Sequence, residues 1–90
     1  MKILYFKNNT CKVCKAMEPK IKEIAEEFNI PFQVINTEEN PEVAGQFLIF
    51  SVPSVVIVDQ DDKELTRFVR NFSLLDIKAY IGRYMYYMNK

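Results

Sequence analysis

Residues 10–17, TCKVCKAM, contain both cysteines of the 90-residue chain, spaced as Cys11-Lys-Val-Cys14. This stretch follows a short apolar run at residues 2–6 and opens a segment whose apolar residues recur every three or four positions. A Cys-x-x-Cys pair placed between a strand and a helix is typical of thiol–disulfide chemistry. The stretch therefore predicts a redox site at the start of a helix over residues 11–29.

The two thiols are expected to differ in acidity and in exposure. With Thr10 as N-cap, Cys11 lies in the first helical turn, where free N–H groups and the helix dipole favour a thiolate. Lys12 and Lys15 lower its pKa further, and the thiolate is the form that attacks a disulfide. Cys14 lies one turn deeper. We therefore expect Cys11 to be the nucleophile and Cys14 to be the buried resolving thiol.

The resolving thiol needs a proton acceptor, and the chain has no histidine. Glu18 follows Cys14 by four residues, so the two side chains share one face of the predicted helix. Glu18 is therefore a candidate general base. The alternative is that Glu18 faces solvent and pairs with Lys22, four residues further along.

The composition bounds the class of protein. Ninety residues with 49% hydrophobic content predict a single domain over residues 1–90. Twelve basic and twelve acidic residues cancel, so we expect no nucleic-acid partner. No stretch approaches the roughly 20 apolar residues of a membrane span, and none has the form of a signal peptide. We therefore predict a cytoplasmic protein without a membrane partner, in which a lone Cys-x-x-Cys is catalytic or regulatory.

Two other uses of the cysteines stay open. Zinc requires about four ligands, so a metal site within one chain is not expected, nor is any other cofactor. A metal- or cluster-bridged dimer could still use Cys11 and Cys14 of two copies. A redox-sensing binding module could also oxidise the pair without turning over a substrate.

The remaining chain alternates between strand and helix signals. Asn40 and Pro41 have the form of a helix start, and Ser73–Asp76 resembles a capping box with Asp in place of Glu. The expected elements are strands at residues 2–6, 32–36, 55–58 and 63–69, the last two paired as a hairpin, and helices at 11–29, 41–47 and from 74 nearly to the end.

The order βαβαββα, with Cys-x-x-Cys at the first helix, Pro19 within it and Val52-Pro53 before the third strand, resembles the thioredoxin superfamily. The resemblance covers nearly the whole chain, at the size of a glutaredoxin. It implies an α/β, thioredoxin-like fold with a central four-stranded mixed sheet flanked by helices. It also implies a cis-proline at Pro53 beside the cysteines, with Thr10, Ser51 and Val52 helping to bind the substrate.

The same resemblance implies a thiol–disulfide oxidoreductase, a protein disulfide reductase acting in cell redox homeostasis. Its partners would be a disulfide-containing protein or small thiol substrate, and a reductase or thiol that donates electrons, with the chain acting as a monomer. The sequence departs from the family pattern at several places. Thr10 stands where thioredoxins have a Trp, and Lys12-Val13 where they have Gly-Pro. Tyr5 stands where thioredoxins have a buried Asp, Val34 where they have a Lys, and Arg70-Asn71 where they have a glycine-bearing loop.

Overall fold

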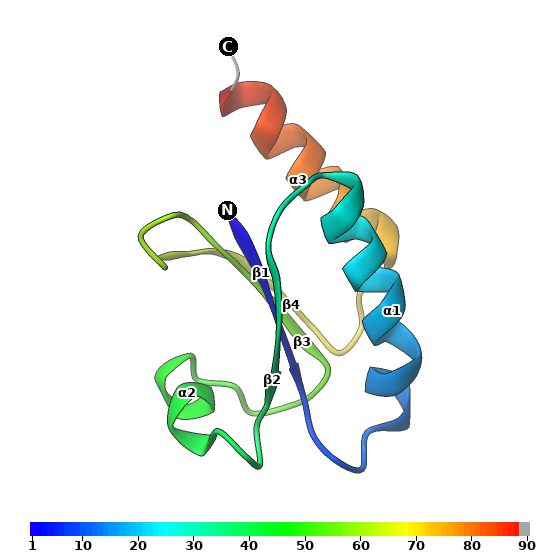
Figure 1. The fold of residues 1–90 in the computed structure, drawn as a ribbon, viewed down its shortest axis with the longest axis vertical. Coiled ribbons are helices and arrows are strands. Elements are labelled where there is room, and N and C mark those ends of the chain that lie inside the picture. The colour runs from blue at the N-terminus through cyan, green and yellow to red at the C-terminus, as the bar shows by residue number, and fades with distance from the viewer. Residues whose placement is uncertain (89–90) are drawn as a thin grey trace.

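The computed structural model describes residues 1–88 as one sheet with helices on both faces (Figure 1). The predicted order βαβαββα is confirmed. The strands are β1 (Lys2–Lys7), β2 (Phe32–Asn36), β3 (Ser54–Val58) and β4 (Glu64–Val69), and the helices are α1 (Lys12–Glu27), α2 (Pro41–Gln46) and α3 (Leu74–Met88).

The sheet is mixed, with the strand order β2-β1-β3-β4. β1 pairs in parallel with β2, and α1 makes the crossover that a parallel pair requires. β3 runs antiparallel to both β1 and β4, and the β3–β4 pair is the predicted hairpin. Every residue of β3 is buried, as expected for an uncharged run in the middle of a sheet covered on both faces.

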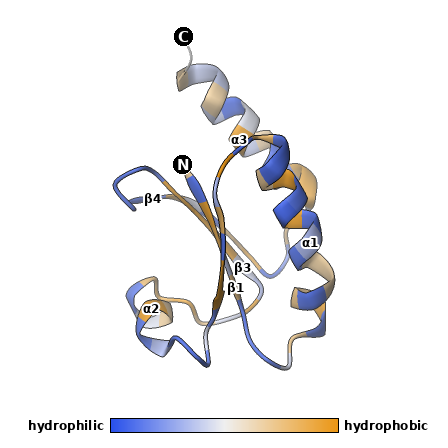
Figure 2. Cartoon of the chain, in the orientation of Figure 1, coloured by the Kyte–Doolittle hydropathy of each residue, from blue (hydrophilic) through white to orange (hydrophobic). Residues whose placement is uncertain are grey.

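Side chains of β1 alternate between two hydrophobic clusters. Ile3 and Tyr5 pack into the larger cluster, under α1 and α3, whereas Leu4 and Phe6 pack into the smaller one, beneath α2. The ring of Phe6 lies 5.7 Å from that of Phe47, just past α2. Figure 2 shows the residues of the central strands as mostly hydrophobic and many residues of α1 as hydrophilic. Because the redox stretch joins β1 to α1, it lies at the edge of the larger cluster.

Both α1 and α2 end before the predicted residue, and they end in the same way. α1 stops at Glu27, because Asn29 adopts a left-handed conformation (φ 56°) that turns the chain away. α2 stops at Gln46, because Leu48 does the same (φ 55°). In each case the two N–H groups beyond the helix bond back to carbonyls of its last turn, which is the Schellman arrangement.

The hydrogen bonds at the start of α3 agree with the sequence-based prediction, whereas those at the start of α2 differ from it. Ser73 and Asp76 form the predicted capping box: each backbone N–H donates to the other's side-chain oxygen at 3.1 Å. Asn40 occupies the N-cap position of α2, but its side chain makes no cap hydrogen bond. The side-chain amide of Asn40 instead donates to the backbone carbonyl of Asn36 at 3.3 Å. Among residues 1–88, no helix combines the length and the apolar character needed to cross a membrane.

Candidate active site

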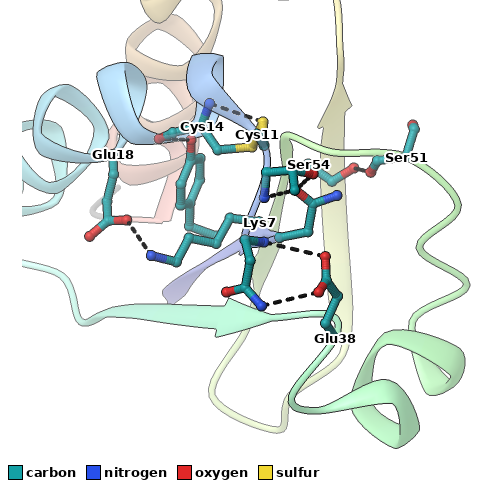
Figure 3. The surroundings of a disulfide bond; sticks show 11 residues. Lys7, Cys11, Cys14, Glu18, Glu38, Ser51 and Ser54 are labelled. Atoms are coloured by element: carbon teal, nitrogen blue, oxygen red, sulfur yellow. Dashed lines mark hydrogen bonds and ion pairs between the residues drawn. A yellow bond between two sulfur atoms is a disulfide. The ribbon is translucent and has the colours of Figure 1, made fainter.

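Cys11 and Cys14 form a disulfide at the junction between β1 and α1, with their Cα atoms 5.2 Å apart (Figure 3). Cys14 is fully buried among the residues of the larger cluster, whereas Cys11 is only partly buried. The sulfur of Cys11 is therefore the one that a substrate can reach. This is the difference in exposure expected from the sequence.

Cys11, and not Thr10, is the N-cap of α1, so the predicted helix start is wrong by one residue. Cys11 has extended backbone angles (φ −81°, ψ 102°), and its sulfur accepts the N–H of Cys14 at 3.1 Å. The sulfur thus fills the place that a Ser or Thr oxygen takes in an ordinary cap. The amide and hydroxyl of Thr10 instead donate to the side-chain oxygen of Asn8, at 3.1 and 3.4 Å.

Tyr5 lies directly beneath the buried cysteine. Its side chain is fully buried, and its hydroxyl donates to the backbone carbonyl of Cys14 at 2.7 Å. Burial, reinforced by the nearby negative charge of Glu18, raises the pKa of Tyr5 to about 12. Tyr5 therefore stays neutral at physiological pH and anchors the first turn of α1 to the sheet.

Glu18 points toward the sheet and pairs with Lys7 of β1, its Oε1 3.4 Å from the Lys7 Nζ (Figure 3). The alternative of a Glu18–Lys22 pair is not what the structure shows. Both partners of the observed pair are about 30% exposed, at 27% and 32%. The sequence analysis missed Lys7, although one signal was available. Tyr5 and Lys7 are two positions apart on a strand and so share the face that meets α1.

The loop before Cys11 is tied to the end of β2 by polar side chains that the sequence analysis also missed. Asn36 donates to the Oδ1 of Asn9 at 2.7 Å, and the side-chain amide of Asn9 donates to Glu38 at 3.0 Å. The backbone N–H of Asn9 also donates to Glu38, at 3.4 Å. No local pattern predicts these bonds, because their partners lie 27 and 29 residues apart in the chain.

Lys12 and Lys15 are exposed on one side of the disulfide. With Asn9, Thr10 and Cys11 they line an open cavity of about 330 Å³. None of the ion pairs found among residues 1–88 involves either lysine. Their charges are therefore free to act on the Cys11 sulfur or on a bound substrate.

The segment Ser51–Pro53 lies near the disulfide, and Figure 3 places Ser51 and Ser54 on the side of the disulfide away from Glu18. The Val52–Pro53 peptide bond is cis, and Pro53 is buried. The segment is held at both ends: Ser54 Oγ donates to the Ser51 carbonyl at 2.7 Å, and the Arg70 N–H donates to the Pro53 carbonyl at 3.1 Å. Arg70 does so from a left-handed conformation (φ 58°).

Metal-ligating side chains do not gather elsewhere in the part of the chain that the structure describes. Among those residues, no three His, Cys, Asp or Glu side chains lie close enough together to hold a metal ion.

This strand–helix junction, with a reachable and a buried cysteine three positions apart, defines a redox protein of the thioredoxin type. The thioredoxin family model matches residues 1–83. The structure of thioredoxin 1 from Thermosipho africanus is 50% identical to the chain over the whole of both, with a TM-score of 0.95. The chain belongs to the thioredoxin family.

Curated relatives match over shorter stretches. Thioredoxin 1 of a Nostoc species is 39% identical over 49 residues, which are 52% of this chain and 46% of the relative. The thioredoxin-like protein YdfQ of Bacillus subtilis is 35% identical over 68 residues, which are 74% of this chain and 60% of the relative. The matched part of the chain thus spans about half the length of the cyanobacterial thioredoxin.

Proposed function

We propose that this chain is a thiol–disulfide oxidoreductase that reduces disulfides with the Cys11–Cys14 pair. The observation that carries the proposal is the pairing of a reachable Cys11 sulfur, at the N-terminus of α1, with a fully buried Cys14. A site for disulfide exchange needs one sulfur that meets the substrate and a second that meets only the first.

In the first step, the reduced chain uses the Cys11 thiolate to attack one sulfur of a substrate disulfide. A new sulfur–sulfur bond forms, the substrate bond breaks, and the first substrate sulfur leaves as a thiolate that takes a proton from solvent. The N-terminal position favours the Cys11 thiolate because helix N–H groups point toward its sulfur. The charges of Lys12 and Lys15 act in the same direction.

In the second step, Cys14 loses its proton and attacks Cys11. The Cys11–Cys14 bond forms, the mixed disulfide breaks, and the second substrate sulfur leaves as a thiol after protonation. Two electrons have then moved from the chain to the substrate. We propose Glu18 as the acceptor of the Cys14 proton. Its location one helical turn beyond Cys14, on the side that faces Tyr5 and Lys7, supports this role.

Substrate binding is assigned to the two sides of the disulfide. Thr10 borders the cavity beside Lys12. Ser51 and Val52 line a second cavity, and Pro53 follows them directly in the chain. The substrate class is a disulfide-bearing protein or a small disulfide, and a reductase or thiol regenerates the dithiol. We propose that the chain acts as a monomer in the cytoplasm, where a lone Cys-x-x-Cys is kept reduced between turnovers.

The test compares the two cysteine variants during reduction of a small disulfide, bis(2-hydroxyethyl) disulfide, with a dithiol as electron donor. Cys11→Ser should lower turnover at least about a thousand-fold, because the nucleophile is lost. Cys14→Ser, reduced and then separated from the dithiol, should still attack the small disulfide and should accumulate the mixed disulfide, seen as added mass on Cys11. A wild-type rate no faster than that of the free dithiol would instead indicate a redox-sensing module.

A further inference from the structure

Phe50 has the most exposed of the large hydrophobic side chains among residues 1–88, at 90% exposed. A single exposed apolar residue on a protein surface requires no explanation by itself. Leu75, on the outer side of α3, is also 75% exposed. What distinguishes Phe50 is its position relative to the redox site.

Phe50 lies in the connection between α2 and β3, three residues before Pro53. Three residues span at most about 10 Å, so the ring lies within reach of whatever binds at Pro53. Phe50 also borders a small cavity of about 120 Å³ next to the site, lined by Asn8, Thr37, Ile49, Phe50, Ser51 and Val52. A protein chain whose disulfide reaches Cys11 can extend from the sulfur over this surface.

The connection that carries Phe50 is fixed at its beginning by Arg67 of β4. The Arg67 guanidinium donates to the carbonyl of Phe47 at 2.6 Å and to that of Leu48 at 3.3 Å. Glu64 holds the guanidinium in place through two hydrogen bonds, at 2.8 and 2.6 Å. The Phe47 carbonyl belongs to the C-cap residue of α2 and therefore has no partner within the helix.

The far end of the connection is fixed by the bonds from Ser54 to Ser51 and from Arg70 to Pro53. Phe50 therefore projects into solvent from a backbone that is held on both sides. A contact made by such a residue requires little ordering when the partner binds, which favours affinity.

We propose that Phe50 is a specificity-determining residue that contacts an apolar side chain next to the cysteine of a protein disulfide substrate. The proposal rests on the disulfide reductase function proposed above. The occupant is an extended segment of the substrate, because it continues from the sulfur that Cys11 attacks. Its side chain is apolar because residues 47–58 contain no charged residue, and the Arg67 guanidinium that contacts the start of this segment is already paired with Glu64. Arg67 is a positioning residue that acts through Phe50.

The test uses two short peptides, each carrying its single cysteine as a mixed disulfide with thionitrobenzoate. One peptide has Leu on both sides of the cysteine and the other has Ser. Attack of Cys11 on the peptide sulfur releases the coloured thionitrobenzoate anion, and Cys14 then releases the peptide thiol. The wild-type chain should prefer the Leu peptide about ten-fold in kcat/KM, the range expected for a few buried apolar groups.

Phe50→Ala should lower this preference about five-fold, through KM, and should leave the rate with bis(2-hydroxyethyl) disulfide unchanged. Phe50→Leu should keep most of the preference. The matched control is Leu75→Ala, which removes exposed apolar surface beside the second half of α1 and should change neither rate. An unchanged preference in Phe50→Ala, or an equal loss in Leu75→Ala, would overturn the proposal.

A double-mutant cycle tests Arg67. Arg67→Met should raise KM for the Leu peptide about three-fold while kcat and the small-disulfide rate stay constant. Combined with Phe50→Ala it should add no further loss, because both changes remove the same contact. Additive losses would contradict a role through Phe50. Failure of the wild-type chain to reduce even the small disulfide would overturn the reductase function, whereas reduction without any Leu preference would overturn only this inference.

Discussion

The two sides of the disulfide differ in the chemistry of their side chains. On the helix side, Tyr5, Lys7 and Glu18 surround the buried cysteine with a hydrogen bond and an ion pair. On the loop side, the wall around Phe50 and Pro53 is uncharged and partly exposed. The comparison suggests that the helix side supports the chemistry and the loop side supports the recognition of peptides. Changes on the helix side should alter the chemistry with every substrate, whereas changes on the loop side should alter only the recognition of peptides.

The largest effect on the helix side is expected for Glu18→Gln. Loss of a general base should slow the resolving step at least about ten-fold while the attack step stays unchanged. Single-turnover reduction of a small disulfide separates the two steps. Glu26→Gln, an exposed carboxylate change on the same helix, is the control. An unchanged resolving rate would assign the Cys14 proton to water and leave Glu18 as a partner of Lys7 only.

Tyr5→Phe tests whether the helix side also anchors the structure. It removes the hydroxyl bond to the Cys14 carbonyl and should lower the free energy of unfolding by about 1 kcal/mol, measured by urea denaturation. Substrate preference among peptides should not change. An equal loss of the Leu preference would break the division between the two sides.

The stability that the buried Tyr5 side chain contributes should depend on pH in a defined direction. The pKa of Tyr5 is raised from its ordinary value of 10.0 to about 12, so folding favours the neutral phenol. The stabilisation is fully present below pH 10 and is lost as the pH rises toward 12. Burial also raises the pKa of Tyr80. Alkaline titration of phenolate absorbance should therefore show a late-ionising component that Tyr5→Phe reduces and Tyr80→Phe does not abolish.

Lys12→Gln and Lys15→Gln should each lower the rate of attack by Cys11 slightly, with every substrate. Each removes a positive charge that favours the Cys11 thiolate, so the pKa of Cys11 should rise. The rate of attack at neutral pH should then fall about two- to three-fold, and the reduction potential should also fall. Thiolate absorbance in a Cys14→Ser background measures the first change, and equilibration with glutathione measures the potential. Because both lysines are exposed, high salt should reduce the differences.

The smallest effect concerns the two left-handed helix ends. Asn tolerates this conformation, whereas Leu resists it, so Leu48→Gly should stabilise the chain by roughly 0.5 kcal/mol. Asn29→Gly should change stability less. Urea denaturation of both variants measures the difference, and a destabilised Leu48→Gly would show that the Leu48 side chain contributes more than its conformation costs.

Much of the fold followed from local signals in the sequence. The strand and helix order, the hairpin and the Ser73–Asp76 capping box each depend on residues close together in the chain, and the structure confirms them. The ends of α1 and α2 were placed one or two residues too late. The periodic pattern did not reveal that Asn29 and Leu48 would reverse the backbone.

Features of the site that depend on position along the first helix could be predicted from the sequence. Contacts between side chains on different elements could not. The contrast in exposure between Cys11 and Cys14 follows from helical position alone. The cap at Cys11 was missed because sulfur is an uncommon cap acceptor, and Lys7 was missed because its partner lies on another element. The bonds from Arg67 to the α2–β3 connection join residues 19 and 20 positions apart, which no helical or strand period indicates.

The fully buried strand β3 also bears on what happens when the chain unfolds. Its sequence SVVIV is β-branched and uncharged, which makes it the kind of segment that associates with copies of itself once exposed to water. Proline interrupts such association at one end, and the acidic turn at residues 59–62 repels it at the other. We therefore expect Pro53 to limit aggregation of the unfolded chain, in addition to its proposed role in substrate binding.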